Sequence, residues 1–499
     1  MCRQQGRSRY AKANDTGGCN VRHWPLGCGV KHAFLGFLVA AVISLAADSA
    51  VSAAGSYYVD SVNGNDGNAG TQSAPWQSLS RANSQVLAPG DSLFLKRGSS
   101  WSGQALLVPE NGTAGSRITV DAYGSGASPL ISGVSSCAYV SGDYVTVRNL
   151  TLDDCSWAGI QFAAGATFGL AELNTVSHNA AGVHVATGSS DNTIQKNIVV
   201  NNNKMSVLTP CPPSCSDDSG AFGILLNGNR NKVANNTVSG SDTFSYDFAR
   251  DGAAVELYNA SANTIQRNVA IDNETFSELG GASTTDNTFI YNSVRSATPQ
   301  AKFVVLPGVA LNTTLRNNSA YLTDANSQGF VCYSGCSPTV LHMRNNLVKA
   351  VLKAGYADGA FDDGYGIYKG PAQFSPGPNS TLADPLFHSP TDLHLEPTSL
   401  AIDSGLLLGY STDVDGNPVP SDKPDRGAYE AQAAQTAVCP DFNADGHVDI
   451  FDISSLTAWF GRPVPPTPVQ YDIAPDPPDG FVDIFDISRM TGLFGEHCT

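Results

Sequence analysis

The 499-residue chain has few charged residues and no basic cluster. Asp, Glu, Lys and Arg make up 15% of it, and the formal net charge is −17. Nucleic-acid-binding proteins normally carry a basic patch, so we expect no nucleic-acid partner. No highly charged, low-complexity tract favours disorder. A nucleophile elbow, a phosphate-binding loop and a redox motif are also missing, so the corresponding enzyme classes are not indicated.

Only the N-terminal region has a long apolar run. Small residues at 50–54 follow the run 33–46, which is itself preceded by the basic residues Arg3, Arg7, Arg9, Lys12, Arg22 and Lys31. This order is typical of a secretory signal, and about 14 apolar residues are short for a membrane span. We predict a signal peptide with an extended basic region over 1–54, a secreted or cell-surface protein, and no membrane span after cleavage. An uncleaved anchor is the alternative.

Eight of the eleven cysteines lie beyond this leader. Their spacing suggests four local pairs: Cys137 with Cys155, Cys211 with Cys215, Cys332 with Cys336, and Cys439 with Cys498. Disulfides persist in oxidising compartments, which agrees with export. A zinc site is the alternative for the close pairs, but few histidines and no matching second CxxC lie nearby.

A loose repeat recurs from about residue 146 to residue 320. An apolar–polar–apolar triplet and a Gly/Asn/Ser turn precede a Thr-Ile-x-x-Asn segment, with copies at 193–197, 264–268, 288–292 and 314–318 and a weaker one at 233–236. A spacing of about 20 to 40 residues indicates a solenoid, in which stacked units bury a common core. The recurring Asn predicts an internal ladder between coils.

These repeats resemble the right-handed parallel β-helix of the pectate-lyase-like superfamily. Further similar segments are 57–60, 63–67 and 75–76 at the start, a cap helix over 76–84, a turn at 89–95 leading into the first strand, and closing coils at 384–387, 401–405 and 427–430. The resemblance implies an all-β, right-handed parallel β-helix solenoid over 55–430. It leaves activity open, because the superfamily contains lyases, hydrolases, epimerases and adhesins.

After a linker at 431–438, residues 439–499 contain a duplicated acidic loop. The first loop places oxygen ligands at positions 1, 3, 5, 9 and 12 and Gly446 at position 6, as Ca²⁺ requires. Its ligands are Asp441, Asn443, Asp445, Asp449 and Asp452, with the backbone carbonyl of His447. The second loop offers Asp479, Asp483 and Asp486. Because Pro475 and Pro477 occupy positions 1 and 3, Asp472 or Asp476 substitutes through an insertion.

Aspartate at position 12 and one helix after each loop resemble a dockerin. The resemblance implies a small α-helical calcium-binding domain and a cohesin-like partner. The apolar pairs Ile450-Phe451 and Ile484-Phe485 are more polar in many cellulosomal dockerins, which leaves the partner type open. A bridge between Cys439 and Cys498 would contribute about 4 kcal/mol. Two plain acidic surface turns are the alternative.

Candidate catalytic residues lie on one strand of successive coils. In each triplet the flanking residues point inward and the central residue points outward. The outward stripe is Gln161, His184, Leu225, Glu256 and Glu278, with Lys302 near it in the next coil. Asp251 and Arg250 precede Glu256, and Asp217 and Asp218 lie one coil earlier. We expect the two glutamates to stand side by side, about 4.8 Å apart along the stack.

This cluster suggests two chemistries. In a lyase, carboxylates hold Ca²⁺ against a uronate while Lys302 or Arg250 abstracts a proton. In a hydrolase, paired carboxylates act as acid and base or nucleophile, and crowding raises one pKa. The alternative is that the residues of this cluster are ordinary solvated positions on a face of the β-helix. We expect His184 to be a ladder or surface residue rather than a base. Trp101 and Trp157 are sugar platforms or packing residues.

We therefore expect a secreted polysaccharide-active enzyme, with a lyase ahead of a glycoside hydrolase. Its partner would be an extracellular polysaccharide. The alternative is a non-catalytic surface, adhesion or glycan-binding β-helix.

Overall fold

The computed structural model describes residues 54–213, 215–431, 440–464, 467–474 and 480–495. The predicted signal peptide and linker lie almost entirely outside these residues. Asp476, Asp479 and the proposed Cys439–Cys498 pair also lie outside them.

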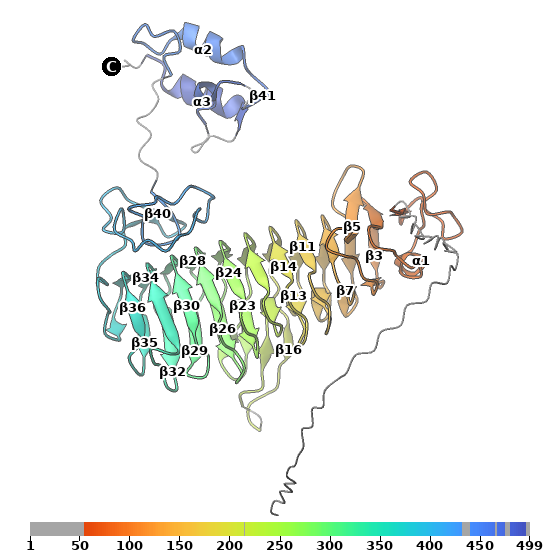
Figure 1. The fold of residues 1–499 in the computed structure, drawn as a ribbon, viewed down its shortest axis with the longest axis horizontal. Helices are drawn as coiled ribbons and strands as arrows, with labels where there is room; N and C mark the ends of the chain where they lie inside the picture. Colours follow the sequence, from red (N-terminus) through yellow and green to blue (C-terminus); the bar gives the residue numbers. More distant parts are fainter. Residues whose placement is uncertain (1–53, 214, 432–439, 465–466, 475–479, 496–499) are drawn as a thin grey trace, which may run out of the picture. The chain divides into compact units, whose positions relative to one another are not determined.

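Three long parallel sheets form a β-helix, and each coil adds one strand to each sheet in turn (Figure 1). The first sheet contains β1 (Ser56–Val59), β2 (Ser92–Lys96), β5 (Ile118–Tyr123), β8 (Val145–Arg148), β11 (Leu170–Glu172), β14 (Thr193–Gln195), β19 (Lys232–Ala234), β24 (Thr264–Gln266), β27 (Thr288–Ile290), β30 (Thr313–Arg316), β33 (Leu341–Arg344) and β36 (Asp362–Gly364).

The second and third sheets have eleven strands each. The second contains β3 (Ser100–Ser102), β6 (Leu130–Ser132), β9 (Thr151–Asp153), β12 (Thr175–Ser177), β15 (Ile198–Val200), β20 (Thr237–Ser239), β25 (Val269–Ile271), β28 (Ser293–Ser296), β31 (Ser319–Leu322), β34 (Leu347–Ala350) and β37 (Ile367–Lys369). The third contains β4 (Leu106–Val108), β7 (Ser136–Val140), β10 (Ala158–Phe162), β13 (Ala181–Val185), β18 (Phe222–Leu226), β23 (Ala253–Tyr258), β26 (Thr275–Gly280), β29 (Lys302–Pro307), β32 (Gln328–Tyr333), β35 (Lys353–Ala357) and β38 (Ala372–Gln373).

The interior of the solenoid is apolar because short strands alternate inward and outward side chains. In the first sheet, Ile194, Val233, Ile265 and Phe289 occupy the same inward position of consecutive coils and are fully buried. In β14 and β24 the flanking residues Thr193, Gln195, Thr264 and Gln266 are polar and only half-buried. The predicted β-helix is therefore confirmed, and its strands run from β1 to β38.

The predicted asparagine ladder is present at the turn between the first and second sheets. From Asn197 onward, each ladder side chain accepts hydrogen bonds from the backbone N–H and the Nδ2 of the Asn one coil earlier, at 2.9–3.1 Å. The ladder comprises Asn174, Asn197, Asn236, Asn268, Asn292, Asn318 and Asn346. It satisfies buried polar groups that would otherwise destabilise the fold.

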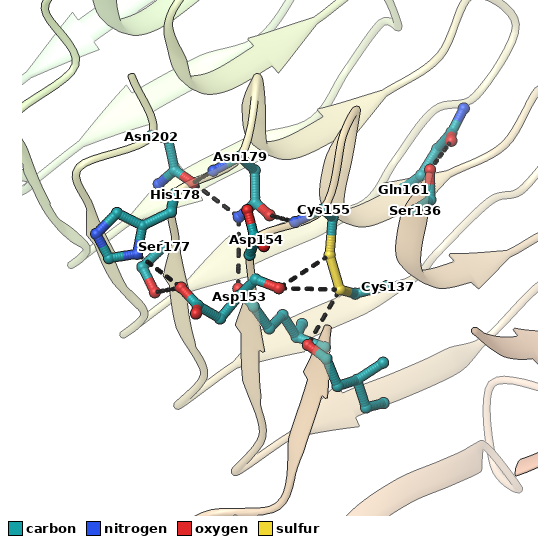
Figure 2. The surroundings of a disulfide bond; sticks show 12 residues. Ser136, Cys137, Asp153, Asp154, Cys155, Gln161, Ser177, His178, Asn179 and Asn202 are labelled. Carbon is teal, nitrogen blue, oxygen red and sulfur yellow. Dashed lines mark hydrogen bonds and ion pairs between the residues drawn. A yellow bond between two sulfur atoms is a disulfide. The ribbon is translucent and has the colours of Figure 1, made fainter. Parts of the chain in front are cut away.

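A second corner of the coils combines an asparagine pair with a disulfide. Asn202 Oδ1 accepts from the backbone and side chain of Asn179, whose own Oδ1 accepts from the backbone N–H of Cys155 at 2.7 Å (Figure 2). Cys155 is bonded to Cys137 across the interior. The structure also forms the predicted pairs Cys211–Cys215 and Cys332–Cys336, so three of the four pairs are confirmed.

The two ends of the solenoid differ from the prediction in detail. Helix α1 (Leu79–Asn83) lies within the expected cap helix and is N-capped by Ser78. The turn at 89–95 leads into the second strand rather than the first, because β1 already pairs with β2 in parallel register.

The segments predicted as closing coils do not form coils. The region 384–430, in which they lie, contains an antiparallel hairpin, β39 (Phe387–Ser389) with β40 (Asp392–Leu395), and otherwise irregular chain. This closing segment returns along the solenoid, where Gly427 N–H donates to Asn345 O at 2.7 Å and the Ala428 N–H donates to Ser319 Oγ at 2.9 Å. Its backbone therefore bonds to side chains and turns of earlier coils instead of extending the sheets.

Two hairpins interrupt consecutive coils between the second and third sheets. The first is β16 (Met205–Val207) with β17 (Ser219–Gly220), and the second is β21 (Thr243–Ser245) with β22 (Ala249–Asp251). Both are antiparallel insertions that enter the third sheet directly, at β18 and β23. Residues of both hairpins lie beside the outer face of the third sheet.

The C-terminal module consists of two similar halves. It contains α2 (Ile450–Thr457), β41 (Arg462–Pro463), the 3-10 helix η1 (Val469–Tyr471), β42 (Phe481–Val482) and α3 (Ile484–Gly492). Gly461 N–H donates to Val482 O at 2.7 Å, and Gly495 N–H donates to Val448 O at 2.8 Å, so the halves bond reciprocally. Among the described residues, no helix has the length and apolarity needed to span a membrane.

Candidate functional site

A cavity of about 630 Å³ lies on the outer face of the third sheet, beside the two inserted hairpins. Its floor comes from β18, β23, β26 and β29, and residues 216–220 together with Phe248 come from the hairpins. All five predicted catalytic residues line it: Asp251, Glu256, Glu278, Lys302 and Arg250. The structure therefore brings together side chains from separate coils.

The register of the strands confirms the predicted stripe. Leu225 pairs with Glu256, Glu256 with Glu278, and Glu278 with Val305. The glutamates thus occupy adjacent strands, and an aliphatic residue flanks the pair on each side. Lys302 pairs instead with Thr275, so it lies at the edge of the stripe, and Val305 takes the position in line.

Burial and mutual repulsion raise the pKa of every carboxyl in this group. Burial raises the pKa of Asp251 to about 7, with Glu278 and Glu274 adding repulsion. Burial, with Glu278 and Asp251, raises the pKa of Glu256 well above its usual range. Burial and repulsion from Glu274 raise the pKa of Glu278, and Lys302 opposes this shift. Such crowding disfavours simultaneous ionisation of these carboxyls.

Glu274 belongs to the same group but was not predicted. It is 3% exposed, forms an ion pair with Lys302 and accepts from Thr275 Oγ1 at 2.5 Å. Burial raises its pKa, and Lys302 opposes that shift. Strand alternation gave no signal for Glu274 because it lies just before β26, outside the triplet.

Arg250 lines the cavity, but its guanidinium is engaged elsewhere. It forms an ion pair with Asp242, which directly precedes β21 of the same hairpin. Arg250 Nε donates to Asp242 Oδ1 at 2.9 Å. This bond raises the pKa of Arg250 and keeps it protonated. The raised pKa disfavours Arg250 as the proton-abstracting base. Lys302, which pairs with Glu274, is the other basic residue among the described residues that line the cavity.

The end of the cavity toward β10 is aromatic and apolar. Trp157 lines it, and its Nε1 donates to His184 Nδ1 at 3.1 Å. His184 is 8% exposed and also contacts Asn227 Oδ1 at 2.9 Å, and burial lowers its pKa. His184 is thus a buried support rather than a base. Trp101 is 1% exposed and packs in the core, which excludes it as a sugar platform.

A second acidic group lies in the hairpins. Ligand atoms of Asp217, Asp218 and Asp247 are all within 4.8 Å of one another. Asp218 accepts from Ser245 Oγ and from the Tyr246 N–H at 2.8 and 2.7 Å, which links the two hairpins. Asp247 was not predicted, because only the hairpin fold brings it to the other two. Carboxylate oxygens of this kind suit a hard cation.

Residues 441–452 form the first of the two acidic loops. Gly446 has φ 90°, and its N–H donates to Asp441 Oδ2 at 2.7 Å. Asp452 is fully buried and accepts from the Phe442 N–H at 2.7 Å. Asp449 caps α2 by accepting from Phe451 N–H. The donor set of carboxylates, an amide and a carbonyl fits Ca²⁺.

The second loop matches the first through Asp472. Its Oδ2 accepts from Gly480 N–H at 2.9 Å, as Asp441 accepts from Gly446. Asp486 is fully buried and accepts from Ile473 N–H at 2.6 Å, as Asp452 accepts from Phe442. The extra residues therefore lie between Asp472 and Gly480. This geometry favours Asp472 as the position-1 residue.

Comparison with known proteins supports the fold class. A family model described as a right-handed β-helix region matches residues 132–368. The solved structure of pectate lyase Pel9A aligns with 77% of this chain and 98% of its own, at 17% identity and a TM-score of 0.50. The protein is thus a right-handed parallel β-helix.

Two further similar proteins are both named lacto-N-biosidase. A curated lacto-N-biosidase of Bifidobacterium longum is 46% identical over 72 residues, which cover 14% of this chain and 4% of that protein. The chain therefore spans only a small fraction of this relative. A GH136 lacto-N-biosidase structure from Eubacterium ramulus aligns over 66% of this chain and 67% of its own, at 16% identity and a TM-score of 0.47.

Proposed function

We propose that this protein is a secreted glycoside hydrolase that cleaves an extracellular glycan in the cavity on the third sheet. One observation carries the proposal: Glu256 and Glu278 stand on adjacent strands in a partly enclosed cavity, between aliphatic neighbours. Two carboxyls flanking the scissile bond are the machinery of glycoside hydrolysis. The names of the relatives, which include glycan hydrolases and lyases, support a carbohydrate substrate.

The environments of the two glutamates suggest different roles. Glu256 has a strongly raised pKa and no cation among the causes of its shift, which suits a general acid that stays protonated. Lys302 counteracts the shift of Glu278, which suits a carboxylate acting as nucleophile or base. Glu274 positions Lys302 through their ion pair.

Conservative substitutions test this assignment. We expect Glu256→Gln and Glu278→Gln each to lower turnover at least about 10³-fold, because each removes a group that acts on the reacting atoms. Release of reducing ends from a glycan panel measures turnover. Glu172→Gln is the matched control, because Glu172 lies on the first sheet, outside the cavity lining, beside Arg148. If both cavity variants keep full activity on a confirmed substrate, the assignment is wrong.

A lyase is the second candidate, because Lys302 lines the same cavity and Asp217, Asp218 and Asp247 offer cation ligands nearby. In this mechanism Lys302, released from Glu274, would remove the proton, and Asp217, Asp218 and Asp247 would hold a cation that neutralises the uronate. β-Elimination produces an unsaturated uronide with a new ultraviolet absorbance, whereas hydrolysis does not. That absorbance during turnover would favour the lyase, and no cleavage of any glycan would favour a binding or adhesion role.

For the C-terminal module we infer calcium-dependent docking to a cohesin-like protein. Its support is the duplicated loop geometry and the exposed pairs Ile450-Phe451 and Ile484-Phe485, which are between 57% and 64% exposed. Capture of the full-length chain on an immobilised cohesin domain, with and without a calcium chelator, tests this. Retention that does not depend on calcium, or no retention on any cohesin type, would contradict it.

A further inference from the structure

The charges around the cavity are unbalanced. Of the described residues that line it, six are Asp or Glu and two are Lys or Arg. Both cations already have carboxylate partners: Lys302 pairs with Glu274, and Arg250 with Asp242. Within the described lining, neither cation is therefore available to a carboxylate of a ligand without losing an existing ion pair.

This arrangement matches hydroxyl groups and opposes uronate groups. Carboxyl oxygens accept hydrogen bonds, and sugar hydroxyls donate them. The carboxylate of a uronate offers only acceptors and is negatively charged, so bringing it beside Glu278, the proposed carboxylate of the pair, adds repulsion in a partly desolvated space. A neutral sugar meets no such opposition.

The apolar end of the cavity points to the same class. Phe222 and Leu225 are 4% and 6% exposed and cluster with Trp157 on the outer face of the sheet. Leu225 lies one strand from Glu256, so this apolar surface borders the carboxyl pair. Apolar and aromatic surfaces pack against the C–H faces of a neutral pyranose and provide no counter-charge for a uronate.

Trp157 is held in place by a chain of hydrogen bonds. Since its Nε1 donates to His184 Nδ1, the other ring nitrogen of His184 carries the proton and donates to Asn227 Oδ1. Asn227 Nδ2 in turn donates to Tyr258 O at 2.9 Å. A fixed indole loses little conformational entropy when a ring packs on it.

We propose that the cavity binds a neutral glycan rather than a polyuronate, and that Trp157, Phe222 and Leu225 hold the sugar ring next to the carboxyl pair. The location of the cleaved bond rests on the proposed hydrolase function. The choice of ligand class rests on the charges and the apolar surface alone.

Binding to the full-length protein tests the proposal. Calorimetry compares neutral oligosaccharides of hexoses and N-acetylhexosamines with uronate oligosaccharides of equal length, with calcium and with a chelator. We expect neutral ligands to bind at least about tenfold more tightly than uronates in both conditions. Trp157→Ala should weaken neutral binding about tenfold or more. Phe168→Ala, an exposed aromatic outside the cavity lining, should leave it unchanged.

Each result separates the two proposals. Neutral binding that depends on Trp157 supports the ligand class even if Glu256→Gln keeps its turnover, which would overturn only the catalytic assignment. Tighter binding of uronates, with or without calcium, overturns the ligand class and leaves hydrolysis to be judged by product analysis. Binding of neither class, or neutral binding unaffected by Trp157→Ala, also overturns the ligand class.

Discussion

At the scale of single residues, the crowded carboxyls determine both reactivity and pH response. Asp251 is an example: burial is the largest cause of its raised pKa, and repulsion from Glu278 and Glu274 adds to it. A cluster of this kind stores unfavourable electrostatic energy in the folded protein, because ionisation of one group opposes ionisation of the next. Its presence in a cavity is a typical sign of a functional site.

Asp251→Asn should stabilise the protein at high pH. The pKa of Asp251 rises from 3.8 to about 7 on folding, so its carboxyl is favourable when protonated and unfavourable when ionised. Below about pH 4 both states are protonated and the variant gains nothing, and above about pH 7 the gain is complete. After allowance for partial exposure we expect about 2 kcal/mol.

Unfolding midpoints of the two proteins, measured from acid to alkaline pH, check this prediction. The difference should widen as the pH rises from about 4 to about 7 and stay constant above that. A difference that narrows with rising pH would mean that Asp251 is stabilised as a carboxylate. Asp358→Asn is a useful control, because hydrogen bonds from the Cys336 and Gly335 backbones lower the pKa of Asp358 and its variant should show the opposite trend.

At the scale of elements, the asparagine ladder couples each turn to the next. Asn268 is fully buried, donates to Asn292 Oδ1 and Val233 O, and accepts from the backbone and side chain of Asn236. Asn268→Ala leaves several of these groups buried without partners. We expect a loss of about 3 kcal/mol in the free energy of unfolding.

Thermal or denaturant unfolding measures that loss. Asn326→Ala is the matched control, because Asn326 is exposed in a loop, and we expect a change within about 0.5 kcal/mol. Equal effects of the two substitutions would mean that the ladder contributes little to stability.

The spacing of adjacent strands also predicts the stereochemistry of hydrolysis. Glu256 and Glu278 are register partners, and neighbouring strands lie about 4.8 Å apart. Carboxyl groups that keep the spacing of their strands would match the separation of about 5 Å that characterises retaining enzymes, with no room for a water between them. We expect the product to keep the anomeric configuration of the substrate. Proton NMR during early turnover measures this, and an inverted product would exclude the pair as acid and nucleophile.

At the scale of the whole molecule, the β-helix and the C-terminal module each have a hydrophobic core of their own. The module has its own small core of Val448, Leu456, Val482 and Met490. If its loops bind Ca²⁺ as proposed, the ion would contribute directly to the folding of this small domain. The solenoid has a continuous core of its own and does not need that contribution.

Asp445→Asn should weaken calcium binding at the first loop without disturbing the rest of the chain. Asp445 is exposed and is the proposed ligand at loop position 5, and one charge fewer would lower the affinity for Ca²⁺. We expect at least about a tenfold loss at one of two module sites by calorimetry. Asp422→Asn, an exposed aspartate outside the loops, is the control. Unchanged calcium binding in Asp445→Asn would contradict the predicted ligand set.

Local and repeated features of this protein could be predicted from the sequence alone. The strand triplets, the asparagine ladder, three close cysteine pairs and the line of Glu256 and Glu278 depend on periodicity and on contacts between neighbouring coils. Such contacts repeat at a nearly constant spacing, so they leave a visible pattern in the sequence.

The cavity itself was decided only by the tertiary structure. Glu274 and Asp247 lie outside the repeat, Arg250 turns to Asp242, and Lys302 is shifted from the stripe by its register. The prediction that the closing segment forms coils was wrong, because its short motifs do not reveal where they pack. Inserted hairpins and returning chain follow no period, and their positions depend on long-range packing and buried charge, which no local pattern records.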